Sequence, residues 1–449
     1  MNPAAPVSSG LGWFGIVRLG LVQSAIGAIV MLATSLLNRV MVVEYALPAA
    51  MPAGLVAWHY AVQLSRPVWG HGSDRGRRRT PWIVLGMATL ALGALLSVAA
   101  LGLLAARSGW GFALAVLAFS MIGAGVGAAG TSLLALLATR VVPERRAAAA
   151  SITWIMMITG IVITAGVAGS LIDPFSLPRL ARVAGGVAIG AFVVALLGVW
   201  GVEGRSPIAA AGPEGALALG PGPSFGVALR EMMADDEARR FTIFVFTSML
   251  AYSMQDLILE PFAGLLFAFT PGQSTQLSGV QHAGVLAGMI LVGVGGSAFG
   301  KRTPEGMRKW IIGGCIGSAM ALAGLAMAAR VGAGWPLAAN IATLGFANGV
   351  FAVAAIGAMM GLAGANGDAS GSGGREGIRM GVWGAAQAIA FGLGGLIGAV
   401  GVDVGRALTG SAPKTFTIVF GIEALLFLVA ASLVLRSGAR SAPPVPSLA

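Results

Sequence analysis

Charged side chains and cysteine are both scarce in this chain of 449 residues. Only 10% of the residues are charged, whereas 57% are hydrophobic and the mean hydropathy is +0.86. A water-soluble globular protein needs more charged side chains than this to cover its surface. The composition therefore predicts a protein that crosses a membrane many times. The single cysteine, Cys315, excludes an intrachain disulfide and is expected to be a small packed residue.

Long hydrophobic runs are what the sequence has in abundance. A helix needs about 20 predominantly apolar residues to cross the hydrocarbon layer of a bilayer. We expect the first run to direct insertion itself, without a cleavable signal peptide. The sequence predicts an all-α membrane protein of twelve transmembrane helices, at residues 19–43, 50–70, 82–105, 110–138, 149–172, 183–202, 241–269, 277–299, 310–329, 335–362, 378–402 and 414–435.

The basic residues predict the orientation of these helices. With both termini in the cytoplasm, all but seven of the 28 Lys and Arg residues fall on the cytoplasmic side, as the positive-inside rule requires. The seven exceptions are Arg39, Arg107, Arg179, Arg182, Arg330, Arg406 and Lys414. The net charge of +11 is therefore spread over short loops, which argues against a nucleic-acid partner.

A change of composition divides the chain into two parts. Residues 204–239 are rich in Pro, Gly and Ala and then in charge, which is typical of a cytoplasmic linker. Six predicted helices lie on each side, in residues 1–203 and 240–449. This is the pattern of a transporter fold built from two related six-helix halves.

Two acids interrupt the seventh predicted helix. Asp256 and Glu260 follow Gln255 in an otherwise apolar span, where an ionised group costs at least ~2.5 kcal/mol and usually has a partner. Arg39 lies at a similar depth of the first helix, so we expect it to face Asp256 or Glu260, with Glu44 nearer the outer surface. The alternative is that Arg39 extends to the outer headgroups and Glu260 meets water.

The predicted loop between the second and third helices reads Gly70-His-Gly-Ser-Asp-Arg-Gly-Arg-Arg-Arg-Thr80. It resembles the signature of the major facilitator superfamily, although the usual spacing between Asp74 and Gly76 is one residue longer. The loop residues that carry the resemblance are Gly70, Asp74, Arg75, Gly76 and Arg77. A basic turn that only sets the membrane topology is the alternative interpretation.

Motifs in both halves resemble the PucC family, a branch of the major facilitator superfamily found in phototrophic bacteria. These motifs are Asn38-Arg-Val-Met-Val-Val-Glu44, Arg66-Pro-Val-Trp-Gly70, Gly130-Thr-Ser-Leu-Leu-Ala-Leu-Leu137, Pro143-Glu-Arg-Arg-Ala147, Met254-Gln-Asp-Leu-Ile-Leu-Glu-Pro-Phe262 and Gly381-Val-Trp-Gly-Ala-Ala-Gln387. The short loop after Asp74 is more similar to the branch encoded beside bacteriochlorophyll synthesis genes. The resemblance covers nearly the whole chain and implies the major facilitator fold.

The resemblance also implies a function in the intracytoplasmic photosynthetic membrane. A member of this family is expected to assemble pigment-protein complexes by holding or delivering bacteriochlorophyll to light-harvesting or reaction-centre polypeptides, or to the pigment-synthesis machinery. His59, inside the second predicted helix, is a candidate ligand for the magnesium of such a pigment, although a hydrogen-bonded helix histidine is the commoner role. Asp256 and Glu260 could also ligate magnesium, but a structural charge pair is favoured.

Two other classes of function are alternatives for a chain with these features. A conventional facilitator could move a small solute with protons, using Asp256 and Glu260 as the titrating groups. A membrane prenyltransferase needs clustered aspartates for magnesium pyrophosphate, and the only adjacent pair, Asp235 and Asp236, lies in the linker. We therefore expect that the protein is not an enzyme, with the proton-coupled transporter as the main alternative.

Overall fold

The computed structural model describes the larger part of the chain. The described residues are 11–66, 69, 78–106, 108–142, 145–203, 230, 233–234, 236–298, 304–364 and 375–437.

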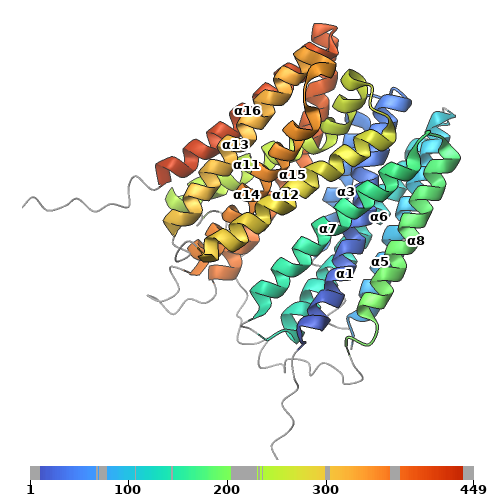
Figure 1. Ribbon diagram of the computed structural model, residues 1–449. Helices are drawn as coiled ribbons and strands as arrows, with labels where there is room; N and C mark the ends of the chain where they lie inside the picture. Colours follow the sequence, from blue (N-terminus) through green and yellow to red (C-terminus); the bar gives the residue numbers. More distant parts are fainter. Residues whose placement is uncertain are drawn as a thin grey trace, which may run out of the picture. The chain divides into compact units, whose positions relative to one another are not determined.

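Every regular element in this part of the chain is helical (Figure 1). The long helices are α1 (Trp13–Met31), α3 (Ala50–Gln63), α5 (Thr80–Ala105), α6 (Trp110–Arg140), α7 (Arg146–Ile172), α8 (Leu177–Val199), α11 (Asp236–Phe267), α12 (Pro271–Ala298), α13 (Pro304–Val331), α14 (Leu337–Gly364), α15 (Arg375–Thr409) and α16 (Ala412–Ser437). Eleven helical stretches among the described residues are long and apolar enough to cross a membrane. The twelfth predicted crossing, 50–70, contains α3 and includes residues outside the described part. The predicted all-α class is confirmed.

The first compact unit consists of Met1–Leu37, Trp58–Ala209 and Thr270–Gly279. Within it α1 packs against α7 and α8, and α5 packs against α6 and α8. The α5–α6 contact depends on small residues, because a Cβ added at Gly125 would lie 2.6 Å from the backbone nitrogen of Leu90. In lipid the hydrophobic effect does not drive helices together, because the lipid tails are as apolar as the side chains. Close approach of the backbones instead stabilises the helix pair through van der Waals contacts.

The second compact unit consists of Asn38–Ala57, Ala210–Phe269 and Val280–Ala449. Here α11 packs against α15 and α16, while α13 packs against α14 and α16. Aromatic rings fill the α11–α16 contact: the ring centroid of Phe262 lies 5.0 Å from that of Phe420. This unit contains the acidic residues of the seventh predicted span.

Each unit includes one short segment from the other part of the sequence. Residues 38–57 group with the second unit, and residues 270–279 group with the first. The boundaries predicted from the sequence are 1–203, 204–239 and 240–449. They place residues 38–57 in the N-terminal half and residues 270–279 in the C-terminal half, so these boundaries stay a proposal. The contacts that hold the two segments supply the physical reason for the grouping.

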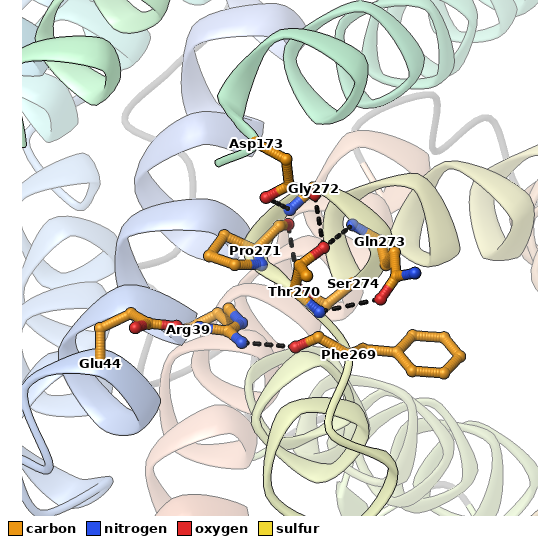
Figure 2. A network of polar contacts seen from close by, with 9 residues as sticks. All are labelled: Arg39, Glu44, Asp173, Phe269, Thr270, Pro271, Gly272, Gln273 and Ser274. Carbon is orange, nitrogen blue, oxygen red and sulfur yellow. Dashed lines mark hydrogen bonds and ion pairs between the residues drawn. The ribbon is translucent and has the colours of Figure 1, made fainter. Parts of the chain in front are cut away.

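Acidic side chains at helix ends make these contacts. Asp403 of α15 accepts hydrogen bonds from the backbone nitrogens of Ala49 and Ala50, at 3.0 and 2.7 Å, where α3 begins. Asp173, just after α7, accepts from the hydroxyl of Thr270 and from the backbone nitrogen of Gly272 where α12 begins (Figure 2). A carboxylate in this position satisfies N–H groups that have no partner within the helix and complements the positive end of the helix dipole.

A third acid caps α5 within the first unit. The two carboxylate oxygens of Glu203 accept from the backbone nitrogens of Arg79 and Thr80 at 2.7 and 2.8 Å. The side chain of Arg140 donates to the backbone oxygen of Glu203 at 2.8 Å. Glu203 therefore ties the end of α8 to the ends of α5 and α6, which explains why this carboxyl is buried.

The first membrane span is not a uniform α-helix. Two π-helical segments, Leu32–Leu36 and Val40–Glu44, flank a short α-helical turn, α2 (Leu37–Arg39). π-helical turns are rare and occur disproportionately at functional sites. Asn38 and Arg39, the first two residues of the second unit, lie in α2 between these π-helical segments.

Candidate functional site

Arg39 is almost fully buried, with 2% of its surface exposed. Its Nη1 forms a salt bridge of 2.5 Å with Oε1 of Glu44, and its Nη2 donates to the backbone oxygen of Phe269 at 2.7 Å (Figure 2). The guanidinium group therefore bonds inside the second unit. The alternative in which Arg39 extends to the outer headgroups is wrong, because that position would leave its side chain exposed.

The π-helical segment explains the Arg39–Glu44 pair. In an α-helix, residues five apart point about 140° away from each other around the axis. A π-helical turn closes with an i→i+5 hydrogen bond, and Tyr45 donates such a bond to Val40 at 3.2 Å. The wider turn brings Glu44 back to the side of Arg39. A prediction based on α-helical spacing could not have found this pair.

The end of α11 is shaped to receive the guanidinium group. A Cβ added at Gly264 would lie 3.1 Å from Nη2 of Arg39, so a larger residue there would crowd the charge. After α11, Ala268 adopts a left-handed backbone conformation, with φ 55°. This conformation ends the helix just before Phe269, whose carbonyl group accepts from Arg39.

Asn38 compensates for a proline inside α11. Pro261 has no backbone N–H, so the carbonyl group of Leu257, four residues earlier, loses its partner within the helix. The side-chain nitrogen of Asn38 donates to that carbonyl oxygen at 2.6 Å. Two motifs far apart in sequence, Asn38-Arg39 and Glu260-Pro261, therefore belong to one structural feature.

The predicted polar residues of α11 are located in the interior of the second unit. Gln255 is 0% exposed and Glu260 is 3% exposed. The alternative in which Glu260 meets water is therefore wrong. Among the described residues, neither amide atom of Gln255 nor Oδ1 of Asp256 has a hydrogen-bond partner. Whether Arg39 also faces Asp256 or Glu260 stays a prediction.

His59 belongs to the first unit and is 1% exposed. Its Nε2 lies 2.9 Å from Nε2 of Gln63, and the oxygen of the same amide accepts from Arg66. Its ring also contacts that of Tyr60, with centroids 4.6 Å apart. These contacts are those of a hydrogen-bonded helix histidine, and a ligand role for His59 stays a prediction.

Several predicted residues fall outside the described part of the chain. They are the loop motif, Gly70, Asp74, Arg75, Gly76 and Arg77. Their predicted role in the cytoplasmic loop stays a prediction. Within the described residues no group of three or more His, Cys, Asp and Glu side chains lies close enough together to hold a metal ion.

Sequence reasoning missed one acid of the second unit. Glu423 lies in α16, is 0% exposed, and neither of its carboxyl oxygens has a hydrogen-bond partner among the described residues. Its signal was present, because the span 412–435 has a hydropathy of 2.6 and an acid there is as unusual as one in α11. The capping roles of Asp173, Glu203 and Asp403 were also missed, since no local pattern links them to the helices they cap.

Solved structures with a similar fold are membrane transporters. A peptide transporter in complex with alafosfalin aligns with a TM-score of 0.68 and 15% identity, over 96% of this chain and 97% of that one. The nucleoside transporter NupG aligns with a TM-score of 0.66 and 12% identity, over 94% and 100%. At such low identity the likeness shows the fold alone, which is the major facilitator fold.

Sequence comparison identifies closer relatives. "Bacteriochlorophyll synthase 44.5 kDa chain" of Rhodobacter capsulatus is 49% identical over 441 residues, which are 98% of this chain and 99% of that one. "Protein PucC" of Cereibacter sphaeroides is 30% identical over 92% of this chain and 90% of its own. The family model described as "PUCC protein" matches residues 36–441. This chain, a membrane protein with the major facilitator fold, belongs to the PucC family.

Proposed function

We propose that this protein is an assembly factor for photosynthetic pigment-protein complexes. It holds bacteriochlorophyll, or delivers it to light-harvesting or reaction-centre polypeptides or to the pigment-synthesis machinery. The observation that carries the proposal is the 49% identity, along nearly the whole chain, to a protein named as a chain of bacteriochlorophyll synthase. A lipophilic cargo also suits a membrane protein in which charged residues are only 10% of the chain.

Polar atoms inside the second unit support a pigment site near α11. A chlorin needs an axial ligand for its magnesium and hydrogen-bond donors for its carbonyl groups. Gln255 offers a buried amide, and Asp256 offers a buried carboxyl oxygen, neither with a partner among the described residues. When bound, the pigment would supply light absorption and a magnesium centre, while these side chains would orient the ring. His59 is a second candidate ligand.

The test is an absorbance spectrum of the protein purified gently from a phototrophic host. We expect stoichiometric bacteriochlorophyll, and we expect its loss from the Asp256→Ala, Glu260→Ala double variant that still elutes as a folded, monodisperse species. Protein from a host unable to make the pigment provides the blank. A wild-type protein that is folded but colourless would contradict the pigment-holding proposal.

A proton-coupled transporter of small solutes is the alternative function. It is favoured by the likeness to peptide and nucleoside transporters and by acids buried inside membrane spans. The test is uptake of labelled peptides and nucleosides into proteoliposomes with an imposed pH gradient. Uptake that depends on the gradient and is lost in Glu260→Gln would favour this function over assembly.

We further propose that the chain is not itself catalytic, and that its relative's name reflects association with a synthase. Purified protein should then leave bacteriochlorophyll precursors unchanged unless the synthesis enzymes are added. We propose the intracytoplasmic photosynthetic membrane as its location, with both termini in the cytoplasm. Fluorescent-protein fusions at each terminus should then be bright, since these reporters mature inside the cell but not after export in unfolded form.

A further inference from the structure

Basic side chains gather at one end of the second unit. Arg330 lies in the last turn of α13, Arg406 in the last turn of α15 and Lys414 in the first turn of α16. With both termini in the cytoplasm, as proposed, this end faces away from the cytoplasm, where basic residues are disfavoured. Three of the seven exceptions to the positive-inside rule are therefore found here, and the proposed pigment site does not require them.

Two of these cations line a cavity of about 290 Å³ at the ends of α13, α15 and α16. Binding sites for small molecules begin at about 300 Å³, so the cavity has room for a ligand the size of a lipid headgroup. Arg406 does not line the cavity, although it lies only three residues before Thr409, which does. The lining residues, all in the second unit, are Arg330, Thr409, Pro413, Lys414, Thr417 and Ile418.

The two cations have no counter-charge in the part of the chain that the structure describes. Neither Arg330 nor Lys414 forms a salt bridge or donates a hydrogen bond there, and no described acid lines the cavity. Asp403, three residues before Arg406, already accepts from backbone N–H groups at the start of α3. Two like charges in one cavity repel each other, and an anion bound between them would remove that repulsion. The cavity therefore has the charge that an anionic ligand requires.

The hydroxyl groups of the cavity hold the helix ends together. Oγ1 of Thr417 in α16 donates to the backbone oxygen of Ala326 in α13 at 3.2 Å. Oγ1 of Thr409 donates to the backbone oxygen of Gly405 at 2.8 Å. A hydroxyl group has a single hydrogen to donate, so these two are already engaged. The N–H groups of the arginine and the lysine are therefore the side-chain donors that the cavity offers to an anion.

An exposed apolar face leads away from the cavity along α16. Ile418 lines the cavity, and Ile422, Leu425 and Val429 follow it at helical spacing on the same face. All four side chains are exposed. In a membrane span such a face contacts the acyl chains of lipids. A free anion would gain nothing from this face, whereas a lipid can place its phosphate between the cations and an acyl chain along the helix.

We propose that this cavity binds the headgroup of an anionic phospholipid, with the phosphate between Arg330 and Lys414 and one acyl chain along Ile418 and Ile422. Basic pockets between membrane helices bind lipid headgroups in this way. A guanidinium group can bind two phosphate oxygens at once, while the ammonium group of a lysine acts as a point charge. The site uses none of the residues of the proposed pigment site, so the two proposals stand or fall separately.

Native mass spectrometry of the full-length protein in detergent, titrated with phosphatidylglycerol, tests the site. We expect the wild-type protein to bind one lipid with higher affinity than any further lipids. The Arg330→Gln, Lys414→Gln double variant should bind this lipid about 30-fold more weakly, because it removes both charges that contact the phosphate. Both side chains are exposed, so the variant should keep the melting temperature of the wild type.

The matched control is Arg406→Gln, which removes an exposed charge from the same end of the unit but not from the cavity. It should leave the affinity for phosphatidylglycerol unchanged. Equal weakening in this control would overturn the proposal, because the attraction would then come from the general surface charge. A double variant that binds like the wild type would also overturn it. Displacement of the lipid by excess inorganic phosphate would do the same, since it would identify a site for a free anion.

Discussion

At the scale of single residues, Arg39 pairs with an acid five residues away in its own span, a pair that the sequence did not predict. Depth along the helices predicts that Arg39 faces the acids of α11, and the structure shows a salt bridge of 2.5 Å between Arg39 and Glu44. The π-helical turn is the cause, because it changes which side chains share a face. A buried arginine with both an acid and a carbonyl group as acceptors is fixed in position, which suits a residue that shapes a binding site.

We expect Arg39→Ala to lower the free energy of unfolding by about 2 kcal/mol, because it leaves Glu44 and the carbonyl group of Phe269 without their donor. Water replaces part of the lost interaction, since the Glu44 side chain is 31% exposed. The charge exchange Arg39→Glu, Glu44→Arg should recover at least half of the loss. Unfolding in an SDS titration of the purified protein measures both effects.

A second exchange, Arg39→Glu with Glu260→Arg, tests the prediction that Arg39 also faces the acids of α11. Recovery of stability by this exchange would support that prediction. Equal losses in the single variants, with no recovery in either exchange, would mean that the three charges act separately.

At the scale of elements, a proline inside α11 is compensated by another helix. Pro261 leaves the carbonyl group of Leu257 without an intrahelical donor, and Asn38 supplies one at 2.6 Å. In hydrocarbon, each unsatisfied backbone group costs several kcal/mol, so such a proline is tolerated only where a neighbour replaces the lost bond. Within the second unit, this requirement places Asn38 beside the carbonyl group of Leu257.

A double-mutant cycle tests the compensation. Asn38→Leu should destabilise the protein by about 1 to 3 kcal/mol, because the carbonyl group of Leu257 loses its only donor from outside α11 that the structure describes. In the Asn38→Leu, Pro261→Ala double variant, the new backbone N–H of residue 261 can bond to Leu257, so most of the loss should be regained.

The single variant Pro261→Ala is the control for that cycle, because helix propensity alone predicts a gain from removing a proline. The cycle supports the bond only if the free energy of unfolding of the double variant is higher than the value expected by adding the changes of the two single variants. Strict additivity of the two substitutions would show that Asn38 and Pro261 are energetically unrelated.

At the scale of the whole molecule, two aspartates bind helix starts that group with their own compact unit. Asp403 binds the start of α3, and Asp173 binds the start of α12, and each of these starts belongs to the unit of its aspartate. The two contacts follow one design, in which an acid satisfies the N–H groups at the start of a helix distant in sequence.

We expect Asp173→Ala and Asp403→Ala each to lower the free energy of unfolding by about 1 kcal/mol, the usual cost of losing a capping side chain. Asp173→Asn and Asp403→Asn should lose less, because an amide oxygen still accepts from the backbone. SDS titration with tryptophan fluorescence measures the four variants. Alanine and asparagine variants of equal stability would contradict the capping role.

The sequence alone determined the membrane as the solvent, the eleven spans that the described residues contain, and the family. These properties are local: a window of about 20 apolar residues selects a helix in lipid regardless of its neighbours. The unusual acids of α11 were equally visible, since any charge in such a window stands out. Glu423 could have been recognised by the same rule.

Only the tertiary structure decided which polar groups meet. The bond between Asn38 and Leu257 joins residues 219 positions apart, and that between Asp403 and Ala49 joins residues 354 positions apart. Composition and spacing do not determine the rotation of a helix about its axis, and one π-helical turn changes the facing side chains. The Arg39–Glu44 pair, the Asn38–Leu257 bond and the capped helix starts therefore depend on the folded structure, because neither composition nor α-helical spacing determines which side chains meet.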